Sequence, residues 1–521
     1  MNRLEFAGAR LEAALDRYLE ASFAEQNNCN QDPAEMLARS LGQLSDLAVL
    51  EQQIQQAKVA VGLMRNSSAA IVPIHRLSSN LLTRIFIGVV ASETCGLDLK
   101  DTNQLPKAPI YLTHICSRWR KIAVASSDLW THIDLSPSIL KNQRSLSHVQ
   151  TFLSRSEQSS IYLHVEYAAD ENGDASRLNH FISALASRIQ GVKCCINLTW
   201  PVSELEFSCA ALSCFLNENT TPGRLTMLDV SIKGTARVFF IEATGRKQYG
   251  DSLTLDMPTY RLNELLLPVT TLRIDRIYPP WTSKAYYGLL DLRIRTIYSI
   301  RESKLVSILI HSPQLRVLEI SNQIDFTGTP LAPVALHSLE ILITHNPSYS
   351  DLGRFLRLLD TGSRPLFLSI DFPHVNDQLD QNLMDFFSRS NVTTLCTVQF
   401  PLFHKSLELV NLAHTIKKLA MDPPAIHLFS EGHSDAPAGT RVCLDTLYFL
   451  GTFGIEINKL RDVIDWSGVR KLVIWGDVYW STNNGRPIIS KQSLLNELLD
   501  LGVATEILPT DSPSPLDYFL S

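Results

Sequence analysis

The chain has 521 residues with a formal net charge of −6; 45% of its residues are hydrophobic and 19% are charged. A chain of this length exceeds one ordinary hydrophobic core, so we expect several domains or one extended repeat array. The charged fraction lies below the roughly 25% of an average globular protein, which argues against long disordered arms. The acidic balance argues against nucleic acid as a ligand, because that class of partner usually requires a basic surface.

The lack of targeting signals and the pattern of cysteines both favour a protein of the cell interior. Residues 1–26 lack a basic leader followed by an apolar block, and no apolar run approaches the roughly 20 residues that span a bilayer. The nine cysteines are scattered and form no Cys-x-x-Cys pair, which is typical of thiols in a reducing compartment. We therefore expect a cytoplasmic or nuclear protein that does not bind membranes.

Residues 1–65 are predicted to form two helices. Apolar residues recur at helical spacing from Leu4 to Phe23. The second helix begins with Asp32, Pro33 and Glu35, which together form a capping box around an initial proline. Its later part carries a short heptad seam, made of Leu47, Leu50, Ile54, Ala57, Val61 and Met64.

Two interpretations of this seam stay open. Residues 33–64 could form an intermolecular coiled coil, or an ordinary helix that packs on its neighbour. Intermolecular coiled coils usually sustain three or four heptads, and this seam is shorter. We therefore expect the helix to pack within the chain, or beside the next domain, and the protein to be a monomer.

Residues 70–135 hold the most specific pattern of the chain. It consists of a leucine-rich helix followed by a cysteine, an arginine pair that flanks a tryptophan, and a terminal Leu-Trp. Its members are Leu77, Leu81, Leu82, Ile85 and Phe86, then Ile115, Cys116, Arg118, Trp119, Arg120, Ile122, Ala123, Leu129 and Trp130. The pattern resembles the F-box, and particularly the F-box-like domains of fungal proteins.

The resemblance implies a small all-helical unit that binds the Skp-type adaptor of a cullin ubiquitin ligase. It assigns adaptor binding to Leu77, Leu81, Leu82, Ile85, Phe86, Ile115 and Trp119. Ser78 and Ser79 stand where the family has prolines, and Asn80 replaces its usual glutamate. Serine caps helices well, so we still expect helices over residues 79–91 and 110–124, with Trp119 and Trp130 mostly internal.

Residues 136–508 alternate between strand and helix patterns. Strand alternation over residues 161–165 is followed by helical spacing over 178–189 and by a second strand over 192–198. A Leu-x-x-Leu-x-Leu type signature then recurs, at Leu225/Leu228/Val230, Leu289/Leu292/Ile294, Leu315/Leu318/Ile320, Leu336/Leu339/Ile341, Leu395/Val398/Phe400, Leu444/Leu447/Phe449 and Val469/Leu472/Ile474. This pattern resembles leucine-rich repeats and predicts an α/β solenoid, with residues 509–521 as a tail.

The resemblance to leucine-rich repeats has a gap. The asparagine that usually follows the strand is missing, and Gln323, Thr452 and Asp477 stand at its position in three copies. The alternative is therefore an irregular α/β domain with parallel strands. Either way, the predicted fold class is α/β, with N-terminal helices, a small helical F-box-like unit and a long strand–helix array.

The functional hypothesis is a substrate receptor and not an enzyme. The sequence has no phosphate-binding loop, nucleophile elbow or zinc-protease motif, and we expect no cofactor or metal. The F-box-like unit would bind the Skp-type adaptor, and the repeats would bind a protein substrate that the sequence does not identify. Candidate contacts are outward strand residues, namely Arg293, Arg316, Glu319, Glu340, Tyr448 and Trp475. Alternatives are a ligase-independent scaffold and a plain repeat scaffold whose start only mimics an F-box.

Overall fold

The fold is mixed α/β in a computed structural model of the whole chain. The structure describes residues 3–26, 33–68, 70–93, 107–168, 174–198, 204–217, 220–234, 237–244, 252–295, 299–321, 323–326, 329, 331–345, 349–371, 381–398, 409–410, 413–422, 443–450, 453–456, 461, 464, 467–475, 478–481, 487–488, 502–509, 512 and 514–516. Among these residues, no helix is both long and apolar enough to cross a membrane.

The chain divides into two compact units, and the division passes through residues 70–135. The first unit comprises residues 1–85 and 114–122, and the second comprises residues 86–113 and 123–521. Helix α3 (Ser79–Ala91) therefore contributes to both units. The domain boundaries near residues 70 and 135 remain a prediction from the sequence.

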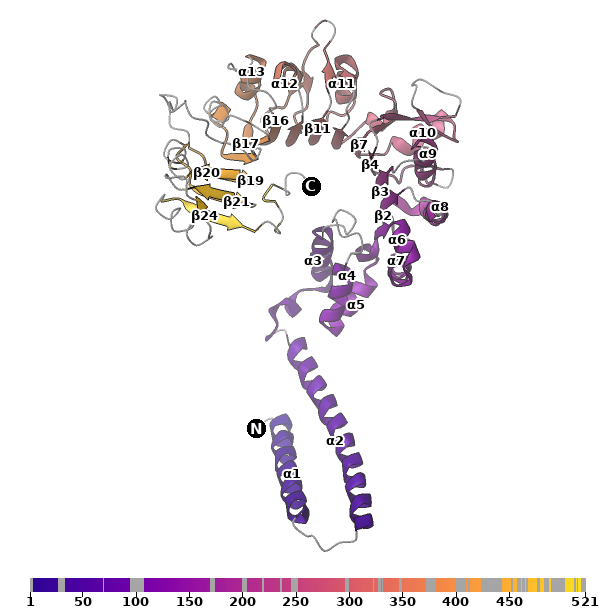
Figure 1. Cartoon of the computed structure of the whole chain (residues 1–521), viewed down its shortest axis with the longest axis vertical. Helices are drawn as coiled ribbons and strands as arrows, with labels where there is room; N and C mark the ends of the chain where they lie inside the picture. Colours follow the sequence, from indigo (N-terminus) through magenta and orange to yellow (C-terminus); the bar gives the residue numbers. More distant parts are fainter. Residues whose placement is uncertain are drawn as a thin grey trace. The chain divides into compact units, whose positions relative to one another are not determined.

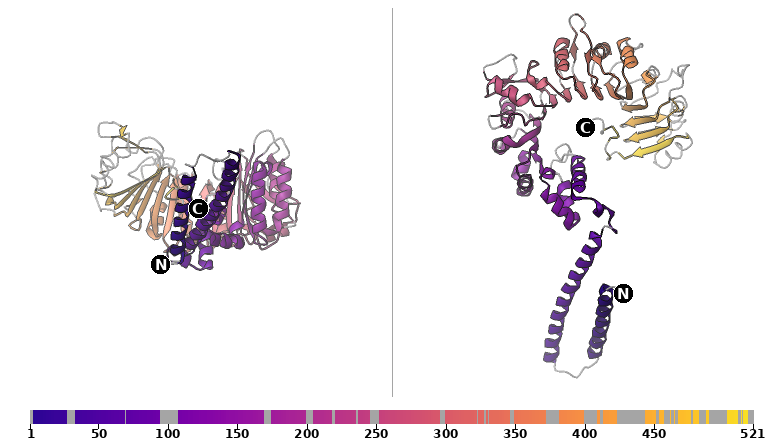
Figure 2. Two further views of the ribbon diagram at one scale, coloured as in Figure 1. Left: turned by 90° about the horizontal axis from the view of Figure 1, so that it is seen from below. Right: turned by 180° about the vertical axis from the view of Figure 1, so that it is seen from behind.

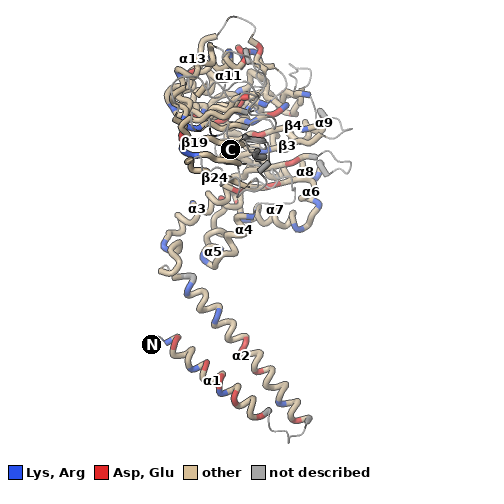
Figure 3. Tube along the Cα trace, turned by 60° about the vertical axis from the view of Figure 1, so that its left-hand side comes forward, with Lys and Arg blue, Asp and Glu red and all other residues tan. Residues whose placement is uncertain are grey.

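The two N-terminal helices expose their apolar side chains. Helices α1 (Arg3–Gln26) and α2 (Pro33–Ser67) match the predicted bounds closely. Within the seam of α2, Leu50 is 40% exposed and Val61 is 44% exposed. The expectation that this helix packs on its neighbour is therefore not met. Charged residues are sparse on α2 (Figure 3) and comprise Glu35, Arg39, Asp46, Glu51, Lys58 and Arg65.

The helix expected over residues 110–124 is broken at Cys116. It forms α4 (Ala108–Ile115) and α5 (Ser117–Ala125). The thiol of Cys116 accepts a hydrogen bond from the backbone N–H of Trp119 at 3.4 Å and so takes the role of a helix cap. The other helices are η1 (Pro73–Arg76), η3 (Ser127–Trp130), α6 (Pro137–Lys141), α7 (Gln143–Arg155), α8 (Asp174–Leu185), η4 (Ala186–Arg188), α9 (Glu204–Ser213), α10 (Thr259–Leu266), η5 (Lys284–Tyr286), α11 (Glu302–Ile310), α12 (Tyr349–Arg357) and α13 (Gln381–Arg389).

The second unit is built on one parallel sheet of 14 strands, whose order in space follows the order of the chain. The strands are β1 (His132–Leu135), β2 (Ile161–Ala168), β3 (Ile189–Asn197), β4 (Met227–Lys233), β7 (Thr271–Asp275), β9 (Asp291–Arg295), β11 (Val317–Ser321), β14 (Ile341–Thr344), β16 (Leu366–Asp371), β17 (Val392–Val398), β18 (Lys418–Asp422), β19 (Thr446–Leu450), β21 (Lys471–Trp475) and β24 (Ala504–Leu508). The prediction of a mainly parallel sheet is thus confirmed.

Four small sheets lie in the connections between these strands. They contain β5 (Phe239–Ala243), β6 (Ser252–Leu255) and β8 (Ile277–Tyr278); β10 (Ile300–Arg301) and β12 (Ile324–Asp325); β13 (Val334–Ala335) and β15 (Leu359–Asp360); and β20 (Phe453–Glu456), β22 (Val478–Ser481) and β23 (Pro487–Ile488). Among them, β22 and β23 pair antiparallel.

Register explains why the leucine signature recurs. One leucine of each strand pairs directly with a leucine of the next strand, so the leucines form a continuous row from β4 to β21. Most signatures contribute their middle leucine, but two predicted copies are out of register, because the row holds Leu342 instead of Leu339 and Leu395 instead of Val398. The row runs through Leu228, Leu272, Leu292, Leu318, Leu342, Leu368, Leu395, Leu419, Leu447 and Leu472, all fully buried. Burial of each leucine contributes about 1.5–3 kcal/mol, which is available only when neighbouring strands stack.

The leucine rows and the opposite side of the sheet have different roles. Helices α8 to α13 cover one side of the curved sheet, and the strands themselves form the surface of its other side (Figures 1 and 2). Side chains alternate along a strand, so the residues next to each row leucine point to the opposite side of the sheet from the leucines. We call the side that these residues form the inner face.

Candidate functional site

The structure separates the seven predicted adaptor-binding residues by exposure. Leu82 and Phe86 are fully buried. In contrast, Leu81 is 48% exposed, Ile85 is 43% exposed and Ile115 is 57% exposed. Leu77 and Trp119 are half-buried. The exposed members are the ones that can contact a partner without unfolding the unit.

Helix α3 begins as the sequence suggested, with a serine cap. Ser78 Oγ accepts a hydrogen bond from the N–H of Leu81 at 3.3 Å. The approach to the helix is fixed by Arg118, whose guanidinium donates to the carbonyls of His75 at 2.7 Å and Leu77 at 2.6 Å. The arginine of the Arg-Trp-Arg motif therefore orients the segment that precedes α3.

The terminal tryptophan of the motif is a core residue, as expected. Trp130 is fully buried and its Nε1 donates to the carbonyl of Ala123 at 2.8 Å. Phe152 meets its ring edge-on at a centroid distance of 5.0 Å. The guanidinium of Arg155 lies 4.3 Å from the ring centroid, within the range of a cation–π interaction. Trp130 thus joins the helical segment to α7, which follows the first strand.

A second candidate site lies on the inner face of the sheet, where the character of one row of side chains changes. The row pairs residue by residue across neighbouring strands. It runs through Asp134, His164, Lys193, Asp229, Arg273, Arg293 and Glu319, and continues through Ile343, Ser369, Cys396, Ala420, Tyr448 and Val473. The row is charged up to β11 and mostly apolar from β14 onward.

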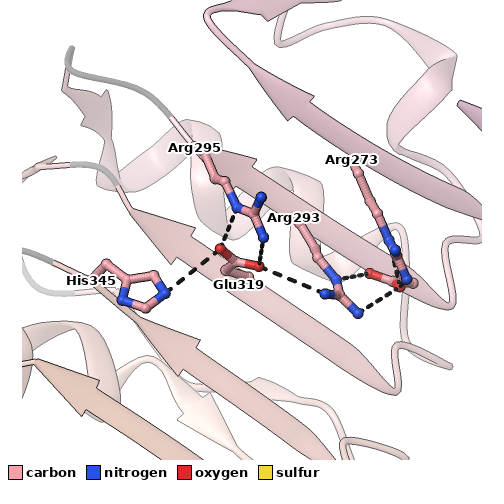
Figure 4. A network of polar contacts seen from close by, with 6 residues as sticks. Arg273, Arg293, Arg295, Glu319 and His345 are labelled. Carbon is pink, nitrogen blue, oxygen red and sulfur yellow. Dashed lines mark hydrogen bonds and ion pairs between the residues drawn. The ribbon is translucent and has the colours of Figure 1, made fainter. Parts of the chain in front are cut away.

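Ion pairs link the charged residues at this transition (Figure 4). Arg273 and Arg293 both contact Asp291, at 2.7 Å and 3.1 Å. Arg295 donates to both carboxylate oxygens of Glu319, at 2.5 Å and 2.8 Å. The Glu319 side chain is only 2% exposed, and Arg293 lies 4.0 Å from it, which completes a connected network.

His345 extends the network, and its partners set the pKa of Glu319. His345 Nε2 lies 3.7 Å from Glu319 Oε1. Burial by itself would raise the pKa of Glu319, but the hydrogen bonds and charge of Arg295, with His345 and Arg293, outweigh burial and hold the pKa below its usual value. Glu319 is therefore an ionised, fully engaged carboxylate at neutral pH.

Two neighbouring aspartates show the opposite balance. Burial raises the pKa of Asp229 and of Asp275, although nearby lysine and arginine side chains oppose it. Within the part of the chain that the structure describes, neither carboxylate accepts the paired hydrogen bonds that Arg295 donates to Glu319. Stabilisation of negative charge on this face is thus concentrated beside Arg293 and Arg295.

An apolar cluster and a cavity adjoin the network. Ile343, Phe367, Cys396, Ala420, Leu450 and Leu516 form a buried cluster, with Ile341, Tyr448 and Trp475 packed against it. A cavity of about 230 Å³ lies beside this cluster, and its wall also includes Arg293, Arg295, Glu319 and His345. The cavity therefore has a charged end and an apolar end.

Four of the six predicted substrate contacts lie on the inner face: Arg293, Glu319, Tyr448 and Trp475. The other two, the exposed Arg316 and the half-buried Glu340, pair with each other at 2.7 Å at positions just before their strands. Sequence reasoning missed His345, Phe367, Cys396, Leu450 and Leu516. The position directly after Leu395 of the recurring signature could have indicated Cys396, but Leu516 lies outside the residues that carry this signature.

One group of side chains on β1 and β2 has the composition of a metal site. Asp134 Oδ1 lies 2.8 Å from His132 Nε2 and 3.6 Å from His164 Nδ1, and all three ligand-type atoms lie within 4.8 Å of one another. A hydrogen bond between His132 and Asp134 accounts for the same geometry. His132 also lines a cavity of about 620 Å³ together with Glu93, Asp128 and Tyr162.

Comparisons with known proteins add no family to these observations. No model of a known protein family matches the sequence, and no curated protein was found that resembles it.

Proposed function

We propose that this protein is the substrate-receptor subunit of a Skp–cullin–F-box type ubiquitin ligase. In this proposal the F-box-like segment binds the Skp-type adaptor, and the 14-stranded sheet is a degenerate leucine-rich-repeat solenoid that binds a protein substrate. The compartment follows the ligase and is cytoplasmic or nuclear. The proposal assigns no catalytic residue to the chain.

The observation that carries the proposal is the exposed apolar side of α3. Leu81, Ile85 and Val89 are 48%, 43% and 44% exposed and recur every four residues, so they share one side of the helix. Arg84 and Arg76 are also exposed nearby in the sequence. Exposed apolar side chains rimmed by charge are typical of protein–protein contacts.

The solenoid part of the proposal is supported by register. Each strand of the main sheet pairs in parallel with the next one along the chain, and the buried leucines stay aligned from strand to strand. Such stacking leaves the inner face free to carry side chains that the core does not require. A receptor of this kind works by proximity, because holding a substrate lysine near the ubiquitin-charged enzyme raises its effective concentration.

The test is direct binding to the Skp-type adaptor of the protein's own cell, by calorimetry. Leu81→Ala combined with Ile85→Ala should weaken binding roughly a thousandfold. Each large apolar side chain at the centre of an interface contributes on the order of 2 kcal/mol to the binding free energy, and 1.4 kcal/mol corresponds to a tenfold change in affinity. Both side chains are about half exposed, so the thermal melt should stay unchanged. Ile310→Ala, at a 57% exposed site on α11, is the matched control and should bind as the wild type does.

Phe86→Ala tests the fold of the helical segment in the same series. Phe86 is fully buried, so its loss should lower the melting temperature as well as the affinity. A wild-type protein with no measurable adaptor affinity would overturn the ligase proposal. Adaptor binding without ubiquitination of any bound partner would instead indicate a ligase-independent scaffold.

A further inference from the structure

A short segment of the chain is seated on the inner face of its own sheet. Leu516 is 2% exposed and belongs to the apolar cluster with Phe367 and Leu450. The indole Nε1 of Trp475 donates to the carbonyl of Ser512 at 3.0 Å. Ser514 and Leu516 line the cavity that Arg293, Arg295 and His345 also line. Side-chain and backbone contacts therefore both fix the segment.

The cluster that receives Leu516 is not a by-product of the solenoid core. Its strand residues occupy inner-face positions, whereas the stacking of the strands depends on the leucine rows on the other side. Phe367, Cys396 and Ala420 are 3%, 4% and 0% exposed although they face away from that core. Such apolar side chains on this face form a groove that fits an apolar side chain from another segment.

The charged end of the groove has spare capacity for an anion. Arg293 and Arg295 face the cavity together with His345, and Glu319 is the carboxylate on its wall. Within the ion-pair network, Arg273, Arg293 and Arg295 exceed the carboxylates of Asp291 and Glu319 by one positive charge, and the Arg295 side chain is 53% exposed. Arginine forms its strongest hydrogen bonds with anionic acceptors. Ser514, which also lines the cavity, brings no charge to it.

We propose that the inner face between β9 and β21 binds an extended peptide that carries a leucine, with an acidic residue two positions before it. In the resting chain, Ser514 and Leu516 occupy this groove. The leucine fills the apolar cluster as Leu516 does. The acidic side chain takes the place of Ser514 and meets Arg295, whose side chain is half exposed. The inference rests on the proposed function in one respect, since it names the class of substrate that the receptor takes.

The resting occupant sets a threshold for substrates. The segment follows β24 after a short stretch of chain, so it competes as an intramolecular ligand whose effective concentration is on the order of millimolar. An external peptide must bind more tightly than this self-ligand to displace it. An acidic residue in place of Ser514 supplies that advantage.

The experiment measures fluorescence anisotropy of labelled peptides with the full-length chain. One peptide has the sequence of residues 509–518, a second carries Ser514→Glu, and a third carries Leu516→Asp. The proteins are the wild type, Leu516→Asp, which releases the resident segment, and Ile310→Asp, which places the same charge at an exposed site on α11. Circular dichroism melts establish that the three proteins are equally folded.

We expect both leucine-containing peptides to bind the Leu516→Asp protein at least about tenfold more tightly than the wild type or Ile310→Asp. The glutamate peptide should exceed the parent peptide by roughly tenfold, and the Leu516→Asp peptide should not bind. Equal affinities in the three proteins would overturn the resting occupancy. A tenfold gain that survives Arg295→Gln in the Leu516→Asp protein would overturn the acidic specificity.

The peptide-binding assay contains no adaptor, so a lack of peptide binding would not bear on the ligase proposal. Adaptor affinity, measured in parallel, should be the same for the wild type and Leu516→Asp. Peptide binding without adaptor binding would leave the groove assigned and the ligase proposal overturned. Ala420→Glu, which places a charge in the floor of the groove, should abolish peptide binding in a protein whose melt shows that it is folded.

Discussion

Glu319 is the residue on which the inner-face network depends. Glu319→Gln should lower the free energy of unfolding of the sheet by about 3 kcal/mol, because it leaves the 5% exposed Arg293 and the adjoining Arg295 without their shared carboxylate. Urea unfolding of the sheet at neutral pH measures the loss. Glu340→Gln, which breaks pairs of Glu340 with the exposed Arg316 and Arg364, is the matched control and should cost less than about 1 kcal/mol.

The same variant gives a pH signature. The folded pKa of Glu319 is depressed, so its contribution to stability is complete above the unfolded pKa and is lost as the pH falls through the folded pKa. The difference between wild type and Glu319→Gln should therefore shrink as the pH falls below the usual glutamate range. A difference that is the same at neutral and acidic pH would show that the loss comes from packing.

At the scale of single elements, the exposed apolar seam of α2 changes the expectation that the protein is a monomer. A short seam suggested a monomer, but that expectation relied on packing within the chain, and Leu50 and Val61 are exposed. We now expect the protein to self-associate through this seam, with a mass in light scattering that rises with concentration. Leu50→Asp should restore the monomer mass, because a charge within an apolar seam is costly.

Val59→Asp provides the control for this prediction on the same helix. Val59 is 61% exposed and lies on the opposite side of α2 from Leu50, given 3.6 residues per turn. It should leave the association unchanged. If the wild-type mass stays that of a monomer at every concentration, self-association through α2 is wrong.

Local signals predicted the elements of this chain well. The capping serine of α3, the start of α2 at Pro33 and the alternation of β2 are all local patterns, and the structure has them. The break between α4 and α5 was missed because Cys116 is not a usual cap. The sequence could not indicate that Leu516 fills the inner face, because this contact joins residues far apart in the chain and depends on the register of six strands.

At the scale of the whole sheet, stability should depend on nearest neighbours. Leu318 is fully buried and pairs with Leu292 and Leu342. Leu318→Ala should cost about 2–5 kcal/mol through the cavity it leaves. Hydrogen exchange should show the largest loss of amide protection in β9, β11 and β14, with smaller losses farther away, because each strand contacts only its neighbours. Ile310→Ala, at an exposed site, is the control.

An even loss of protection across all 14 strands would contradict this expectation and indicate one cooperative unit. The sequence predicted the parallel arrangement through the recurring leucines, but not the number of strands. Some strands of the main sheet lack the leucine signature. Among them, β1, β2, β3 and β24 enter the row through Ile133, Leu163, Val192 and Thr505. Such strands join the sheet by pairing with a neighbouring strand, and a local sequence pattern does not predict that pairing.

The position of β24 at the end of the sheet has a consequence for shortened forms of the chain. It is the terminal strand, its side chains are half-buried or exposed, and Pro509 follows it directly. A form that stops before residue 504 would make β21 the terminal strand, and its Leu472, Val473 and Ile474 are buried. Unpaired N–H and C=O groups beside such side chains template the addition of further strands. Shortened transcripts or clipped products should therefore be prone to insoluble aggregation, although nearly all of the leucine row would remain.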